Sequence, residues 1–352
     1  MEFKDLKVIE KGHLKICRSS DYNFIFNKKT GFFARWGKTK KDDPQYGPSP
    51  EILDLEISSG SDCKGKCPFC YKGNGVGEET HNMTLDEFKT IFHKLPKTLT
   101  QIAYGILNIS TNSDFFPMME YARNNGVIPN YTCHGLDVTP EIAKRTSELC
   151  GAVAVSIINK EKTYDAIKMF SIDNNMSQVN MHYVLADQTY ERAFEIVDDI
   201  SVDPRLKQMN AIVFLQYKHK NENSPYHSVL DVEKYKKLTE YCQEKNVRYG
   251  MDSCSAGIFI ESMKNNPDKK MMELFVEPCE SGLMSSYISC KGKFFVCSFA
   301  EGEDEWVEGL DVLHCNDFIE DIWNHPRLIK WRERLIRNER NCPIYDLSFA
   351  GK

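Results

Sequence analysis

Two hydrophobic periodicities alternate along most of the chain. Apolar residues recur at every second position in short segments, which is typical of β-strands, and at every third or fourth position in longer segments, which is typical of α-helices. After residue 50 the expected strands cover residues 52–58, 101–107, 127–132, 152–157, 178–185, 211–217 and 248–251. The expected helices between them cover residues 84–94, 115–125, 140–150, 164–176, 190–199 and 231–245.

Local signals support several of these helix boundaries. Thr84 followed three residues later by Glu87 forms the pattern of a capping box, in which each residue hydrogen-bonds the backbone of the other. Thr139 precedes Pro140 at the position expected of an N-cap, and Gly126 follows the segment 115–125 as a C-terminal glycine would.

The alternation of strands and helices predicts parallel strands joined by helical crossovers. The sequence therefore indicates an α/β fold with a partial (βα)6 TIM-like barrel, and a doubly wound sheet is the competing arrangement. In both, the loops that follow the carboxyl ends of the strands build the active site. The loop at residues 217–228 carries many charges and is expected to be solvated.

The regions before and after these units have a different character. Residues 1–50 predict an N-terminal β-hairpin layer, with strands at 14–18, 22–27 and 32–36. Residues 252–352 show little periodicity apart from a hairpin that turns at Lys291 and Gly292 and a final helix at 326–337. We therefore expect a β-rich extension at 1–50, a barrel at 51–251 and a small cap domain at 252–352, whose thin core needs a cofactor.

Composition narrows the class of protein. The 352 residues are 41% hydrophobic, with a net charge of −6, which is typical of a globular protein and argues against recruitment of nucleic acid. No apolar run is long enough for a membrane helix and the first residues are charged, so we expect a cytoplasmic protein without a signal peptide or membrane contact. Thirteen cysteines in a reducing compartment then indicate metal or redox chemistry rather than disulfides.

Three of these cysteines form a C-x3-C-x2-C motif directly after the first expected barrel strand. Cys63, Cys67 and Cys70 lie in a loop rich in Gly and Lys, where three neighbouring thiols would oxidise unless ligated. A zinc site with His81 as fourth ligand, or unligated structural cysteines, remain alternatives. On a four-iron cluster, three thiolates leave one iron open to a small molecule.

The motif, with Phe69 before its third cysteine, resembles that of radical S-adenosylmethionine enzymes. The resemblance implies that Cys63, Cys67 and Cys70 hold a [4Fe-4S] cluster whose open iron binds S-adenosylmethionine, and that Phe69 packs near the adenine. It also implies reductive cleavage of S-adenosylmethionine to a 5′-deoxyadenosyl radical, which abstracts a substrate hydrogen. A reducing partner such as flavodoxin or ferredoxin would supply the electron.

The same resemblance suggests further contacts to S-adenosylmethionine. The second strand has Gly105 and Asn108 where the family carries a Gly-Gly-Glu-Pro-like segment that holds the methionine amino group. Ser156 on the fourth strand, and Asn180 and His182 on the fifth, occupy positions that commonly line the ribose and carboxylate. Each of these residues could instead be satisfied inside the barrel as an ordinary strand residue.

The C-terminal region resembles the auxiliary-cluster domain called SPASM, or its shorter Twitch form. This resemblance implies one auxiliary [4Fe-4S] cluster held by Cys254, Cys279, Cys297 and Cys342. A zinc ribbon or unligated cysteines are the alternatives.

Such domains accompany radical enzymes that modify a peptide or protein residue, by epimerisation, crosslinking or thioether formation. Epimerisation needs a thiol that returns a hydrogen, and the candidates are Cys133, Cys290 and Cys315, with Cys133 placed near the active face. The alternatives are a radical enzyme acting on a nucleotide, tRNA or small metabolite, and a non-catalytic metal-stapled protein for binding or electron transfer.

Overall fold

The computed structural model describes residues 3, 5–75, 78–220, 224–273 and 276–349. Its centre is a ten-stranded sheet in the order β13-β12-β11-β10-β9-β8-β5-β14-β15-β16. The strands from β5 to β13 run parallel, as the alternating pattern predicts. Their bounds are β5 Ile52–Glu56, β8 Gln101–Gly105, β9 Ile128–Cys133, β10 Ala152–Ser156, β11 Val179–Leu185, β12 Ala211–Gln216 and β13 Tyr249–Met251.

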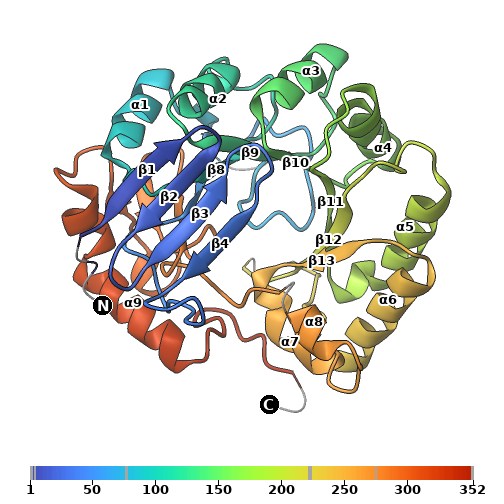
Figure 1. Cartoon of the computed structure of the whole chain (residues 1–352). Helices are drawn as coiled ribbons and strands as arrows, with labels where there is room; N and C mark the ends of the chain where they lie inside the picture. The colour runs from blue at the N-terminus through green and yellow to red at the C-terminus, as the bar shows by residue number, and fades with distance from the viewer. Residues whose placement is uncertain (1–2, 4, 76–77, 221–223, 274–275, 350–352) are drawn as a thin grey trace.

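Six helices lie around the outside of these strands (Figure 1). They are α1 Leu85–Lys94, α2 Phe115–Asn124, α3 Pro140–Leu149, α4 Lys160–Lys168, α5 Tyr190–Val202 and α6 Val232–Glu244. The predicted capping box begins α1, where Thr84 N donates to Glu87 Oε2 at 2.8 Å and Glu87 N donates to Thr84 Oγ1 at 3.2 Å. The helix expected at 164–176 instead begins at Lys160, because Asn159 caps it, and continues as a π-helix, Met169–Asp173.

Side chains on the strands alternate between the helix layer and the barrel interior. In β11, Val179, Met181, Tyr183 and Leu185 are buried in the main hydrophobic core, while the residues between them are half-buried and point the other way. The inner face of the barrel is therefore partly polar, and this polar face surrounds a cavity.

The N-terminal sheet contains one strand more than the sequence indicates. Its antiparallel order is β1 Lys7–Lys11, β2 Leu14–Arg18, β3 Asn23–Asn27 and β4 Phe33–Trp36. The strand β1 is mostly exposed and lies at the edge, so it has no apolar pattern to predict it. The layer packs through Tyr22 and Phe24 against Ile128 of the barrel and Leu283 and Leu335 of the C-terminal region.

The C-terminal region continues the barrel sheet. The strand β14, Ser285–Ile288, pairs parallel with β5, and β15, Lys293–Phe295, returns antiparallel beside it. The short β16, Leu310–Asp311, is the last strand of the sheet. The predicted hairpin turn is confirmed, with Gly292 at φ 68°, a conformation that glycine adopts without strain.

Helices complete the C-terminal region. The predicted final helix is α9, Pro326–Arg337, and two short helices, α7 Ala256–Ser262 and α8 Lys269–Met272, were not expected. Trp323 Nε1 donates to the Gly47 carbonyl at 3.1 Å and joins this region to the segment before β5. Across the described residues, no helix combines the length and apolar character that crossing a membrane requires.

Candidate active site and auxiliary cysteine site

The C-x3-C-x2-C motif lies in a loop that begins where β5 ends. Two short antiparallel strands, β6 Ser58–Ser59 and β7 His81–Asn82, close the base of this loop. The sulfurs of Cys67 and Cys63 lie 3.4 and 3.5 Å from the point where a side chain at Gly65 would begin, so both sulfurs face the same small space.

The three thiols are close enough to influence one another. Burial, together with the neighbouring Cys70 and Cys63, raises the pKa of the Cys67 thiol to about 12. Three thiolates gathered in this way require a compensating cation. An iron–sulfur cluster would supply that charge, and three thiols are the kind of ligand that the motif implies.

The Asn108 side chain holds the cysteine loop in place through hydrogen bonds to the backbone of the loop. Asn108 Oδ1 accepts from Lys64 N at 2.9 Å, and Asn108 Nδ2 donates to the Asp62 carbonyl at 2.8 Å. His134 Nε2 lies 2.9 Å from the same Asn108 Oδ1. Asn108 is only 4% exposed and contacts the loop rather than the cavity below it.

A cavity of about 500 Å³ lies beside the loop, at the carboxyl ends of the barrel strands. It is lined by Cys67 and Cys70 of the motif and by four predicted contacts, namely Phe69, Gly105, Ser156 and His182. Asn180 does not line this cavity, and its Oδ1 accepts from Asn210 Nδ2 at 2.9 Å. Burial lowers the pKa of His182 to about 4, so this imidazole is neutral at pH 7.

The three cysteines considered as hydrogen donors have different surroundings. Thr132 lines the cavity, so its neighbour Cys133 points to the opposite side of β9, where it is 5% exposed in the hydrophobic core. The thiol of Cys315 donates to the Val312 carbonyl at 3.3 Å, away from the cavity. Cys290 lines a neighbouring cleft of about 830 Å³.

The four C-terminal cysteines converge from four separate segments. Cys254 follows β13, Cys279 precedes β14, Cys297 follows β15 and Cys342 follows α9, yet all four line one cavity of about 240 Å³. Burial raises the pKa of Cys297 to about 12, with further contributions from Cys279 and Cys342. Four thiols are the kind of donor set that a cluster needs when the protein holds all of its irons.

All thirteen cysteines are free thiols. Within the described ranges, no three His, Cys, Asp or Glu side chains are grouped so that they could hold a metal ion.

The two cavities share a wall that the sequence did not reveal. Asp54, Lys218, Asp252, Ser298 and Phe299 line both of them. Lys218 is only 4% exposed, although a solvated loop was expected there. Its Nζ lies 3.1 Å from Asp252 Oδ2 and 4.2 Å from the centre of the Phe299 ring, and it hydrogen-bonds the Cys254 side chain.

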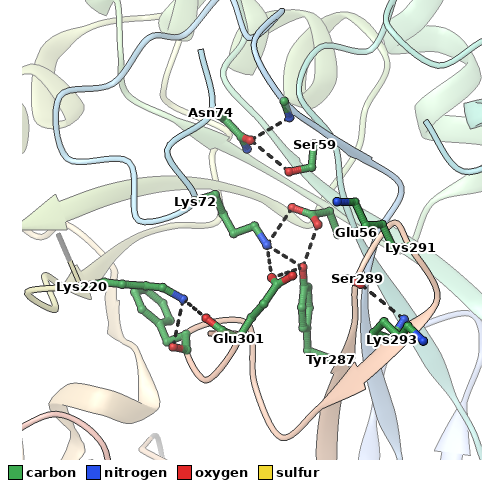
Figure 2. Close-up of polar contacts among 12 residues, drawn as sticks. Glu56, Ser59, Lys72, Asn74, Lys220, Tyr287, Ser289, Lys291, Lys293 and Glu301 are labelled. Atoms are coloured by element: carbon green, nitrogen blue, oxygen red, sulfur yellow. Dashed lines mark hydrogen bonds and ion pairs between the residues drawn. The ribbon is translucent and has the colours of Figure 1, made fainter. Parts of the chain in front are cut away.

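A buried ionic network joins the cysteine loop to the C-terminal region (Figure 2). Lys72 Nζ donates to the Tyr287 hydroxyl at 2.9 Å, lies 3.3 Å from Glu56 Oε1 and pairs with Glu301. The Tyr287 hydroxyl donates to Glu56 Oε2 at 2.8 Å. This network ties the segment after Cys70 to the segment after Cys297.

An aromatic contact supports the same junction. The ring of Tyr71 stacks on the ring of Phe299, with centroids 4.0 Å apart and planes 20° apart. Because Tyr71 directly follows Cys70 and Phe299 lies two residues after Cys297, the stack brings the two cysteine sites close together.

Solved structures share this architecture. Streptococcus suis SuiB aligns with 92% of this chain and 90% of its own, with a TM-score of 0.69 and 11% identity. SuiB bound to precursor peptide SuiA aligns with 82% of this chain and 67% of its own, at a TM-score of 0.64 and 12% identity. The enzyme anSMEcpe, with bound AdoMet and the Cp18Cys peptide, aligns with 84% of this chain and 86% of its own, with a TM-score of 0.57 and 15% identity. The chain shares their fold.

The prediction of a partial α/β barrel is thus confirmed. No protein-family model matches the sequence, and no curated protein sequence is similar enough to match it. A structure of SuiB also contains S-adenosylmethionine, at 12% identity to this chain and a TM-score of 0.64.

Proposed function

We propose that this protein is a radical S-adenosylmethionine enzyme that modifies a residue of a peptide or protein by epimerisation, crosslinking or thioether formation. The observation that carries the proposal is that Cys67 and Cys70 line a cavity at the carboxyl ends of the barrel strands, while the Cys63 sulfur faces the same small space as the Cys67 sulfur. When bound, the cluster and S-adenosylmethionine would supply the 5′-deoxyadenosyl radical that abstracts a hydrogen atom from the substrate.

The residues around the cavity have separate tasks in this proposal. Phe69 offers an aromatic surface for the adenine, while Ser156 and the neutral His182 offer hydrogen bonds to the ribose and carboxylate. Gly105 leaves space for the methionine part, and Asn108 positions the loop. Tyr287, Ser298 and Phe299 of the C-terminal region line one side of the cavity, where they would limit the access of water to a reactive carbon radical.

The proposal gives the three parts of the chain different roles. Residues 51–251 form the barrel that holds the radical site, and residues 252–352 form a SPASM-like region with one auxiliary [4Fe-4S] cluster on Cys254, Cys279, Cys297 and Cys342. Residues 1–50 form a supporting β layer. The enzyme would act in the cytoplasm and take its electron from flavodoxin or ferredoxin.

Peptides are the favoured substrates because SuiB and anSMEcpe, which share the fold, have been solved with peptides bound. The large open cleft beside the cavity, between the cysteine loop and the C-terminal hairpin, offers room for an extended chain.

The test is anaerobic reconstitution of the full chain, followed by measurement of iron per chain and of 5′-deoxyadenosine formed from S-adenosylmethionine under reduction. We expect about eight irons in the wild type and about four in both Cys67→Ala and Cys297→Ala, with nucleoside formation lost in Cys67→Ala. Cys315→Ala, which removes a thiol outside both cavities, should keep all the iron. A wild type without iron, or with zinc and no nucleoside, overturns the proposal.

A further inference from the structure

One carboxylate in the wall between the two cavities has no partner. Asp54 is the third residue of β5, and its neighbours Leu53 and Leu55 are fully buried in the hydrophobic core. Alternation along the strand therefore turns Asp54 to the barrel interior, where its side chain is accessible from both cavities. Among the described residues, no hydrogen bond or ion pair reaches it.

The other carboxylates around this space are already neutralised. Glu56, two residues further along β5, contacts Lys72 and Tyr287, and Asp252 is paired with Lys218. Lys218 hydrogen-bonds Asp252 and Cys254 but not Asp54. Asp54 is thus the acidic group of the shared wall that lacks a cation of its own.

The Asp54 side chain is exposed to the two cavities, so a ligand can reach its carboxylate, and carboxylates with a shifted pKa in such cavities are concentrated at functional sites. Burial raises the pKa of Asp54 to about 6, so the carboxyl is mostly ionised at neutral pH. If thiolate-bound clusters fill the two cysteine sites, they add further negative charge on both sides of it. S-adenosylmethionine would bring a sulfonium cation to the same cavity, and a cation that arrives with the substrate would offset the negative charge that remains.

The position of Asp54 allows a cation from the substrate to bind in the cavity. Of the residues that we assign to S-adenosylmethionine, Ser156 on β10 and His182 on β11 lie three and four strands away from β5, while Gly105 lies on the adjacent strand β8. Asp54 lies on β5 between Ala103 of β8 and Tyr287 of β14, and the stacked rings of Tyr71 and Phe299 line the same cavity.

We propose that Asp54 binds the ammonium or guanidinium group of a lysine or arginine side chain in the peptide substrate. This inference rests on the proposed function for its peptide substrate. It adds that the segment placed in the cavity is basic, and that Asp54 selects it through an ion pair inside the protein.

The test measures binding by the anaerobically reconstituted full chain, without turnover. The probes are Nα-acetyl-lysine methylamide and its uncharged analogue Nα-acetyl-norleucine methylamide, titrated by ligand-observed NMR. A hydrogen-bonded ion pair predicts a preference of about tenfold for the lysine probe in the wild type. The preference should vanish in Asp54→Asn and persist in Asp54→Glu, which keeps the charge.

Asp86→Asn is the matched control, because Asp86 is an exposed carboxylate on α1, and it should keep the preference. Equal affinity of the two probes for the wild type overturns the inference. So does an Asp54→Asn variant that keeps the preference, or one that loses affinity for S-adenosylmethionine but not for the lysine probe. A wild type that forms no 5′-deoxyadenosine contradicts the proposed function, whereas one that forms it without a lysine preference contradicts only this inference.

Discussion

Replacing Lys72 by methionine tests whether the ionic network of Figure 2 holds the cysteine loop to the C-terminal region. The Lys72 side chain is 11% exposed, and its partners Glu56 and Glu301 are 8% and 30% exposed. Methionine keeps much of the apolar stem of lysine and removes its charge. The substitution therefore leaves two carboxylates facing each other without their cation.

The expected loss of stability follows from burial. Removing one partner of a buried ion pair costs about 3–5 kcal/mol, because the remaining charge stays uncompensated. Glu301 is exposed enough to turn toward water, and Glu56 keeps the hydrogen bond from Tyr287. We therefore expect a loss near the lower end of that range, about 3 kcal/mol.

Urea unfolding of the full chain, kept reduced and free of oxygen, measures this loss. The fluorescence of Trp306, Trp323 and Trp331, which are buried in the C-terminal region, reports on the side of the junction that must separate. The control is Lys291→Met, whose pair with Glu78 is mostly exposed and should contribute less than about 1 kcal/mol.

A second substitution identifies the cause of the loss. If the unpaired Glu56 carboxylate destabilises Lys72→Met, then adding Glu56→Gln should restore much of the stability. A loss below about 1 kcal/mol in Lys72→Met, or a double variant no more stable than the single one, would refute the reasoning.

Three further predictions concern pH, redox potential and iron retention. Burial raises the pKa of Glu51 from 4.5 to about 7, so its contribution to stability is complete below pH 4.5 and is lost as the pH rises through 7. In Glu51→Gln the midpoint of urea unfolding should therefore fall less between pH 4.5 and 7 than in the wild type. An equal fall in both proteins would contradict the raised pKa of Glu51. Lys218→Met removes a cation and a hydrogen bond from Cys254. The reduction potential of the proposed auxiliary cluster, measured in an EPR-monitored titration, should therefore fall by about 40–65 mV. An unchanged potential would exclude an influence of Lys218 on this cluster. Asn108→Ala removes two hydrogen bonds from the loop backbone, so a chelator should extract iron several-fold faster than from the wild type, and an equal rate would contradict a positioning role.

Elements whose own residues carry a clear period were predictable from the sequence. The expected strand at 178–185 is β11, Val179–Leu185, and the expected final helix is α9 with the same bounds. The strand β1, KVIEK, lies exposed at a sheet edge, so no burial selects an apolar pattern there. The pairing of β14 with β5 could not be predicted either, because periodicity identifies a strand but not the distant strand with which it pairs.

Some residues of the candidate site could likewise be proposed from the sequence, and others could not. Cys63, Cys67 and Cys70 could be proposed as ligands from the sequence because their spacing within one loop is itself the signal. Asp54 and Glu56 were missed because the alternation in ILDLE is also that of a strand with one solvated face, and only the arrangement of the strands as a partial barrel turns that face inward. For the same reason, no local pattern showed that Cys133 would point to the helix layer.

The pairing of β14 with β5 explains why the two cysteine sites share a wall. A partial barrel leaves the outer edge of its first strand unpaired, and an open edge invites pairing with another strand. Here β14 occupies that edge, which places Cys279 before it and Cys297 after the following strand, both beside the inward face of β5. The strand that leads into the Cys63–Cys70 loop thus also forms one side of the cavity lined by the C-terminal cysteines. A group bound at Asp54 would therefore lie between the two sites, so the nature of the substrate and the charge of both sites are linked through this single strand.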